Sequence, residues 1–297
     1  MVKHRKRTII LFLLPAFTLI ILFVYVPILM NFYYALFQWS AFSATKQFVG
    51  TKNLIRLFTD PTIRICIKNN LIYAVFSITF QVGLALVLAA VLEDKLFRGS
   101  QPFFRTVYFL PSLISVTVVG LLWQMIYSPV FGFLNPMLKA AGLSFWAKDW
   151  LGSQSLAIYA VTMVSQWQYT GYTMVLFIVA LQKIPEDLYE AATIDGAGRL
   201  KRFFHITIPQ AKGMIIVNMV ITIIGSFKVF DEIYVMTSGG PGVASQVLGS
   251  YLYKTAFSTD EMGYASAIAT LVFIITFLLS IMQLKLSKPP CPFLAPP

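Results

Sequence analysis

The sequence contains little sulfur, little imidazole and little charge. Its 297 residues include two cysteines, Cys66 and Cys291, and two histidines. Neither cysteine belongs to a C-x-x-C pair and the two lie far apart, which excludes a disulfide framework and a Cys/His zinc site. Charged residues make up 12% of the chain and hydrophobic residues 58%, an almost fivefold ratio where a soluble domain has about twofold. These proportions exclude a soluble globular protein.

Acidic residues are scarcer than basic ones, with 12 Asp and Glu against 23 Lys and Arg and a net charge of +11. In a soluble chain such an excess would suggest a nucleic-acid partner. Here the basic residues lie mostly at the ends of long apolar runs, where they set the topology of a membrane protein. We therefore expect a membrane and no nucleic acid.

Catalytic signatures are missing as well. A Walker A loop needs G-x-x-x-x-G-K-[ST], and the stretch from Gly196 to Lys201 lacks both this spacing and the final hydroxyl. There is no H-E-x-x-H or G-x-S-x-G sequence. We expect no catalytic residue, no metal site and no cofactor bound by this chain.

The chain offers six apolar runs of the length that crosses a membrane. About 20 helical residues span the hydrocarbon core, and a backbone in lipid must satisfy its polar groups as a helix. The fifth run contains one basic residue, Lys228, and the first follows the basic cluster of residues 3–7 but is too long for a signal peptide. We predict an all-α membrane domain over residues 1–287, a disordered Pro-rich tail over 288–297, and spans at about 8–30, 71–92, 106–127, 157–181, 214–234 and 262–284.

The basic residues near the span ends indicate the orientation. With the N-terminus inside, the inner segments hold 14 Lys and Arg and the outer segments hold 8. Five of those 8 lie between Lys46 and Lys68, against the general trend. The strongest cluster precedes the first span, so we expect both termini in the cytoplasm.

A short helix is predicted in the loop between the fourth and fifth spans. Pro185 suits the first helical position, Glu186 and Asp187 favour the positive end of the helix dipole, and Gly196 or Gly198 can end the helix in a left-handed conformation. The spacing of Leu188, Ala191, Ala192 and Asp195 places them on one face. Because this face is small in the middle, a second protein's backbone could approach it closely.

The sequence of this loop resembles the permease subunits of binding-protein-dependent ABC importers, which carry E-A-A, then D-G-A, then Phe, Ile and Pro. The matching residues are Glu190-Ala191-Ala192, Asp195-Gly196-Ala197, Phe203 or Phe204, Ile206 and Pro209. The Phe109-Leu110-Pro111 segment, Trp167 and the turn at 237–241 look like the MalF-type sugar branch of this family.

The resemblance implies the transmembrane domain of a type I ABC importer in a bacterial or archaeal inner membrane. In that family the E-A-A loop is a coupling helix that docks on a cytoplasmic ATPase. Glu190 would pair with a basic group there, Ala191 and Ala192 would permit close insertion, and Gly196 would supply the turn. Asp195 belongs to the same set of expected coupling residues. The implied partners are a second homologous permease, two copies of an ATPase that uses ATP and Mg, and an extracytoplasmic solute-binding protein.

Polar and aromatic residues inside spans are candidates for a substrate path, because such groups in lipid must face a cavity or another helix. Hydroxyl, amide and aromatic groups suit a carbohydrate, although a single Ser or Thr often bonds within its own helix. Lys228 has Asp231 and Glu232 at i+3 and i+4, which predicts an ion pair; a phosphate-bearing solute is the alternative reading. The candidates, partly carried over from MalF-type permeases, are Ser112, Ser165, Trp167, Gln168, Tyr169, Thr222, Ser226 and Lys228.

Two other functions compete with a sugar permease. An ion-driven secondary transporter would need acidic residues in the centres of its spans and pseudo-symmetric halves, and no span has such an acid. A permease for amino acids or peptides stays open, because it would share the E-A-A loop.

Overall fold

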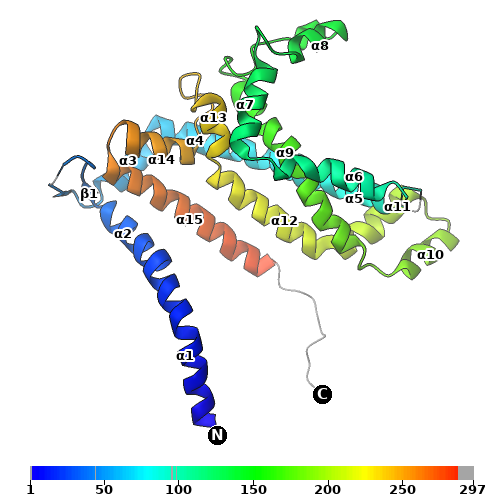
Figure 1. The fold of residues 1–297 in the computed structure, drawn as a ribbon, viewed down its shortest axis with the longest axis horizontal. Helices are drawn as coiled ribbons and strands as arrows, with labels where there is room; N and C mark the ends of the chain where they lie inside the picture. Colours follow the sequence, from blue (N-terminus) through cyan, green and yellow to red (C-terminus); the bar gives the residue numbers. More distant parts are fainter. Residues whose placement is uncertain (1, 44, 95, 98, 287–297) are drawn as a thin grey trace. The chain divides into compact units, whose positions relative to one another are not determined.

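The computed structural model describes residues 2–43, 45–94, 96–97 and 99–286, and the predicted tail at 288–297 lies outside them. The described chain is mostly helical (Figure 1). It forms two compact units, one built from Met1–Ile63 with Tyr251–Ile274 and the other from Arg64–Ser250 with Ile275–Pro297.

The first unit contains the N-terminal span, the short segments that follow it and most of the last span. Asn31 donates hydrogen bonds to the Ser266 carbonyl and the Thr270 hydroxyl, each at 3.2 Å, which joins the first and last spans. Asp60 accepts bonds from the Tyr251 and Tyr264 hydroxyls, each at 2.7 Å. The elements are α1 (Val2–Ile20), the π-helical turn η1 (Ile21–Tyr25), α2 (Val26–Tyr34), the antiparallel pair β1 (Phe37–Gln38) and β2 (Gln47–Phe48), α3 (Lys52–Thr59), the start of α4 (Pro61–Phe76), the end of α14 (Leu248–Tyr253), η6 (Lys254–Ser258) and most of α15 (Met262–Leu286).

The second unit contains the remaining spans. Its elements are most of α4, η2 (Ser77–Leu84), α5 (Ala85–Glu93), α6 (Gln101–Phe109), η3 (Leu110–Leu113), α7 (Val116–Tyr127), α8 (Leu134–Ala140), η4 (Ser144–Trp146), α9 (Ala157–Leu181), α10 (Glu186–Ile194), α11 (Arg199–Arg202), η5 (Phe203–Thr207), α12 (Ile208–Lys228) and α13 (Asp231–Thr237).

The core of the second unit surrounds α9. One cluster of buried side chains joins α9 to α7 and α13, and another joins it to α5 and α12. Met174, Phe177 and Ile178 on α9 are completely buried in the second cluster. At Gly171 a Cβ would lie 1.7 Å from the Tyr108 carbonyl oxygen. The glycine therefore permits direct contact between the backbones of α9 and α6.

Within the described residues, four helices are long and apolar enough to cross a membrane: Leu11–Tyr34, Pro61–Glu93, Arg199–Lys228 and Met262–Met282. A bent pair, Gln101–Leu113 with Val116–Tyr127, makes a fifth if it is one span. The remaining predicted span, the fourth at 157–181, coincides with α9, Ala157–Leu181. The polar residues at the centre of α9 lower the mean hydropathy of this helix, so the predicted count of six spans remains a prediction.

The structure corrects the third predicted span. A continuous helix was expected over 106–127, but the chain bends by 96° between Leu113 and Val116. Pro111 has no N–H to continue the helical ladder, the helix tightens to a 3-10 turn, and Ile114 is extended. The expected single helix is therefore two helices joined at a break.

The fifth predicted span is also corrected. It was expected to run to residue 234, but the helix that begins at Arg199 ends at Lys228 and α13 begins at Asp231. Three charges within five residues are costly in hydrocarbon, which explains why the span ends there. Because Lys228 and Asp231 lie on different helices, the predicted i, i+3 pairing does not apply. No carboxylate of a described residue forms an ion pair with Lys228.

Candidate functional site

The E-A-A segment forms the short helix that its sequence predicts. Pro185 precedes the first turn in an extended conformation, and Glu186 and Asp187 occupy that turn. At the other end Gly196 is left-handed, with φ of +76°. Its N–H donates to the Thr193 carbonyl, and the Ala197 N–H donates to the Ala192 carbonyl at 2.8 Å. This is a Schellman motif, so Gly196 ends the helix as predicted.

Side-chain contacts hold α10 against the span that follows it. The hydroxyls of Tyr189 and Thr207 lie 3.0 Å apart, and Arg202 donates to the Thr193 hydroxyl at 2.9 Å. Tyr189 and Thr193 are four residues apart and share one face of α10. These two contacts join α10 directly to the membrane helix Arg199–Lys228.

Ionic and polar contacts connect the base of the same loop to the second and third spans. Arg199 forms an ion pair with Asp94 at 3.3 Å. Gln182 donates to Glu93 at 2.9 Å, and Gln101 donates to the same carboxylate. The loop is thus attached to the cytoplasmic ends predicted for several helices, all within the second unit.

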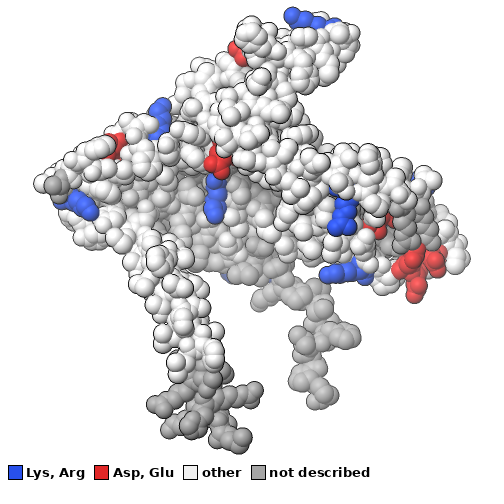
Figure 2. All heavy atoms as spheres, viewed as in Figure 1, with Lys and Arg blue, Asp and Glu red and all other residues white. Residues whose placement is uncertain are grey.

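The other side of α10 faces away from the protein. Glu190, Ala191 and Asp195 are exposed, while Ala192 is half-buried. Figure 2 shows acidic side chains as one patch where Figure 1 places α10; Glu186 and Asp187 belong to the same helix. The sequence analysis did not single out two apolar side chains near this patch, Ile194 at 87% exposure and Leu200 at 76%. The signal available for Ile194 was its place as an apolar residue at the end of a short helix whose first turn is acidic.

The centre of α9 presents a buried amide to the break in the third span. Gln168 is 1% exposed and its Nε2 donates to the Ile114 carbonyl at 2.9 Å. Its Oε1 is buried and has no hydrogen-bond partner. Gln166, two residues earlier and therefore on nearly the opposite face of α9, donates to the Ser77 hydroxyl at 3.0 Å and also has an unpartnered Oε1. A buried acceptor without a donor is costly, so a donor from a solute would stabilise Gln168.

The other predicted path residues differ in their surroundings. Ser112 and Ser226 donate to carbonyls of their own helices, at 2.7 Å to Phe109 and 2.7 Å to Thr222, so these hydroxyls follow the intrahelical alternative. Ser165 and Thr222 are buried.

The aromatic members lie on the more accessible side of α9. Trp167 is 44% exposed and packs edge-to-face against Trp123, with ring centroids 5.6 Å apart. Tyr169 is half-buried, and Lys228 is exposed at the end of α12. The predicted set is therefore distributed between the interior of the helix bundle and its surface, with Gln168 as its most enclosed polar member.

The structure adds buried polar residues that the sequence analysis did not single out. Glu232 is 8% exposed and lies beside the buried Tyr73, which also interacts with Ser165. Asn70 is fully buried and donates to the Ser226 carbonyl at 2.6 Å. The only sequence signal for Asn70 was its position between the charged Lys68 and an apolar run. Among the described residues, no group of three His, Cys, Asp or Glu side chains could hold a metal ion.

Comparisons with known proteins agree with this geometry. The family model for the "binding-protein-dependent transport system inner membrane component" matches residues 81–288. The probable ABC transporter permease protein YurN of Bacillus subtilis is 54% identical, over 97% of this chain and 98% of the relative. The trehalose/maltose transport system permease protein MalF of Thermococcus litoralis is 30% identical, over 96% of each chain.

A solved structure shows the same fold. It is a bacterial ABC transporter involved in the import of the acidic polysaccharide alginate, with a TM-score of 0.80 and 24% identity over 96% of this chain and 98% of the matched chain. The resemblance drawn from the E-A-A loop and the type I importer fold are thereby confirmed. The chain belongs to the family of inner-membrane components of binding-protein-dependent transport systems, and is a multi-pass permease subunit.

Proposed function

We propose that this chain forms half of the pathway of an ATP-driven importer for a neutral sugar or oligosaccharide. The exposed, capped E-A-A helix attached to the membrane helices carries the coupling part of this proposal. The relative named for trehalose and maltose supports the substrate class. The other half of the pathway comes from a second, homologous permease, and an extracytoplasmic binding protein delivers the solute.

Energy comes from two copies of a cytoplasmic ATPase, which bind ATP and Mg. Glu190 pairs with a basic group of the ATPase, and Ala191 permits close approach of its backbone. Ile194 and Leu200 add apolar area that becomes buried on docking. Ala192, Asp195 and Gly196 fix the end of the helix, so that docking moves α10 and the span at Arg199–Lys228 together. Both termini of the chain lie in the cytoplasm with α10.

The solute passes beside the break in the third span. The unpartnered Oε1 of Gln168 accepts a hydrogen bond from a sugar hydroxyl, and Trp167 with Tyr169 covers an apolar ring face. Ser112, Ser165, Thr222 and Ser226 shape the surrounding helices. Because Gln168 also bonds to Ile114, solute binding and the geometry of the break are coupled.

A phosphate-bearing solute is the second candidate, and one observation favours it. Lys228 is exposed and makes no ion pair with a described carboxylate, so the neutralisation expected from Asp231 and Glu232 is not formed. If the solute is neutral, Lys228→Met leaves uptake intact. If the solute is anionic, the same change raises the KM for uptake.

The first experiment is to express the chain with its neighbouring genes, purify it in mild detergent and determine the mass of each co-purifying chain. A second multi-pass permease with two copies of a Walker-A-bearing ATPase supports the importer. Recovery of this chain alone supports the secondary transporter instead.

Coupling is then tested by Glu190→Lys, with Asp149→Lys as a control for the same charge change at another exposed site. The Glu190 variant should be inserted normally but lose solute-stimulated ATP hydrolysis, whereas the Asp149 variant should keep it. A parallel pair is Ile194→Asp against Val130→Asp, because both apolar side chains are largely exposed, at 87% and 76%. Normal stimulation in both α10 variants would refute the docking role of this face.

A further inference from the structure

The loop of residues 128–150, which joins α7 to α9, buries a polar side chain and exposes its largest apolar ones. Asn135 is buried, donates to the Lys148 carbonyl at 2.9 Å and accepts from the Trp150 indole N–H at 2.9 Å. This pattern is unfavourable for a loop surrounded by water, because large exposed apolar surface favours another apolar medium. The apolar side chains that are at least half exposed include Phe131, Phe133, Met137, Phe145 and Trp146.

Both ends of the 128–150 loop lie at the level of the first turns of α9. Tyr127, the last residue of α7, is buried, and its hydroxyl donates to the Ala160 carbonyl at 3.3 Å. The Trp150 ring stacks on the Tyr127 ring, with centroids 5.9 Å apart. The chain therefore leaves the helices of the second unit and returns to them at one level, near Ala160.

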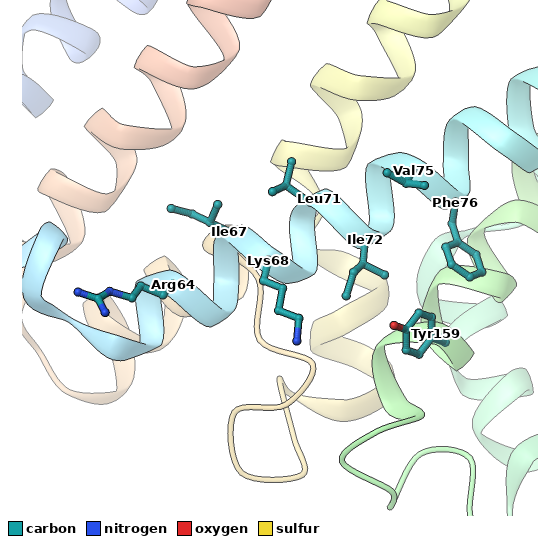
Figure 3. Close-up of a pocket in the computed structure, with 8 residues that line it drawn as sticks. All are labelled: Arg64, Ile67, Lys68, Leu71, Ile72, Val75, Phe76 and Tyr159. Atoms are coloured by element: carbon teal, nitrogen blue, oxygen red, sulfur yellow. The ribbon is translucent and has the colours of Figure 1, made fainter.

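That level lies close to the edge of the hydrocarbon. Tyr159, next to Ala160, contacts Phe76 of α4 with ring centroids 5.5 Å apart, and Figure 3 shows both side chains lining one pocket. Phe76 is five residues inside the apolar run that is predicted to begin at residue 71, and at 1.5 Å per residue this is a depth of about 7 Å. The 128–150 loop therefore starts at the membrane boundary and not in the water above it.

The direction of α7 keeps the loop near this boundary. The chain bends by 96° between the helical segment that ends at Leu113 and α7. Figure 1 shows α7 crossing the direction of α12, with α8 beyond its end. The 12 residues of α7 are about 18 Å long. The 128–150 loop is therefore carried sideways, past the other helices of the second unit, to where the surrounding medium is lipid.

The composition of the loop is typical of a membrane interface. Aromatic rings and long basic side chains are enriched at that level, because the basic side chains can reach the lipid phosphates. Phe145 and Trp146 are exposed together with Lys139 and Lys148. The only acidic residue of the loop, Asp149, accepts a hydrogen bond from the Gly152 N–H at 2.8 Å and so stabilises a local turn. The core of a protein interface is instead depleted in lysine, so lipid fits this surface better than a protein partner.

We propose that the 128–150 loop lies in the interface of the membrane leaflet opposite α10, with its aromatic side chains among the upper acyl chains. Lys139 and Lys148 lie at the level of the phosphates. The lipid contact holds whichever solute the protein transports.

The test uses the complex reconstituted in vesicles of phosphatidylethanolamine and phosphatidylglycerol. Separate variants carry the photo-reactive residue p-benzoylphenylalanine in place of Phe131, Phe145 or Trp146, and mass spectrometry of the irradiated protein identifies what each position has bonded to. The matched control is the same replacement at Ile194, which is 87% exposed against 90% for Phe131 but lies on the acidic helix α10. Burial of one aromatic side chain favours an apolar position by about tenfold or more. We therefore expect at least about tenfold more lipid adduct at each of the three positions than at Ile194.

A second measurement needs no new chemical group at the site. The intrinsic tryptophan fluorescence of the complex is recorded in lipids that carry bromine, a quencher, either near the headgroup or near the end of the acyl chain. Bromine near the headgroup should quench the wild type more than it quenches Trp146→Phe. Bromine at the chain end should show a smaller difference between the two proteins, because Trp146 lies at the interface.

Three results would overturn the proposal. Adducts of the three positions with the second permease or with the solute-binding protein would show that a protein covers this surface. No excess of lipid adduct over the Ile194 control would show that the loop stands in water. Equal quenching of the wild type and Trp146→Phe by both lipids would place Trp146 outside the membrane.

Discussion

Replacing Asn70 with alanine should loosen the protein at the junction of three segments. The Asn70 amide donates to the Ser226 carbonyl at 2.6 Å and accepts from the Leu248 N–H at 3.0 Å. Ser226 lies in the last turn of α12 and Leu248 is the first residue of α14. Both groups belong to helix ends, where the backbone has no partner of its own. The Asn70 side chain therefore provides hydrogen-bond partners for two backbone groups that would otherwise have none.

The magnitude follows from what Asn70→Ala leaves behind. Leu248 is fully buried, and a buried backbone group without a partner costs about 1–3 kcal/mol. Hydrogen bonds between membrane helices measure at the low end of this scale. Two such groups give an expected loss of about 2–4 kcal/mol, which is a factor of about 30 to about 1,000 in an opening equilibrium.

The buried thiol of Cys66, one turn before Asn70 on α4, provides the assay. In a Cys291→Ser background, a maleimide should label Cys66 about 30 to 1,000 times faster in the Asn70→Ala variant than in the protein with Asn70 intact. This holds when the thiol reacts only after the structure around it has opened locally. The control is Asn218→Ala, because Asn218 is also buried but its amide donates only within its own helix, to Met214 at 3.1 Å. A labelling rate for Asn70→Ala within about fivefold of this control would refute the bridging argument.

Two further predictions concern other parts of the fold. Gly171→Ala should destabilise the protein by about 1–3 kcal/mol, because the new methyl group meets the Tyr108 carbonyl. Gly213→Ala on α12 should instead stabilise the protein by up to about 1 kcal/mol, because its methyl group meets nothing within 4 Å. Thermal unfolding of the two variants checks the sign of each effect. Burial raises the pKa of the Asp60 carboxyl, but hydrogen bonds from two tyrosine hydroxyls and from Thr62 outweigh it, so its pKa lies below the ordinary value. The stabilisation from a depressed carboxyl pKa is complete above about pH 4 and is lost as the pH falls through the folded-state pKa. Thermal scans at a series of pH values should show this loss of stability in the wild type and a flatter dependence on pH in Asp60→Asn. Identical pH dependence in the two proteins would contradict this prediction.

Local patterns explain the parts of the protein that the sequence predicts correctly. The run of apolar residues at 157–181 matches α9 at both ends, because a long uncharged segment in lipid can satisfy its backbone only as a helix. The helix α10 and its end at Gly196 follow from residues within a dozen positions of one another. The E-A-A motif needs only its own loop, so the sequence also suffices to indicate the family.

Contacts between distant residues decide the rest. Apolarity over 106–127 does not reveal that the chain bends at Ile114, because that bend is supported by Gln168, 54 residues later. Likewise Asn70 bonds to groups 156 and 178 residues away, and no periodicity records such a pairing. The sequence by itself determined the class of protein, most of its helices and the exposed helix α10, because these depend on local composition and capping. Only the tertiary structure decided where the helices break and which polar groups meet in the interior, because both depend on which helix ends the fold brings together.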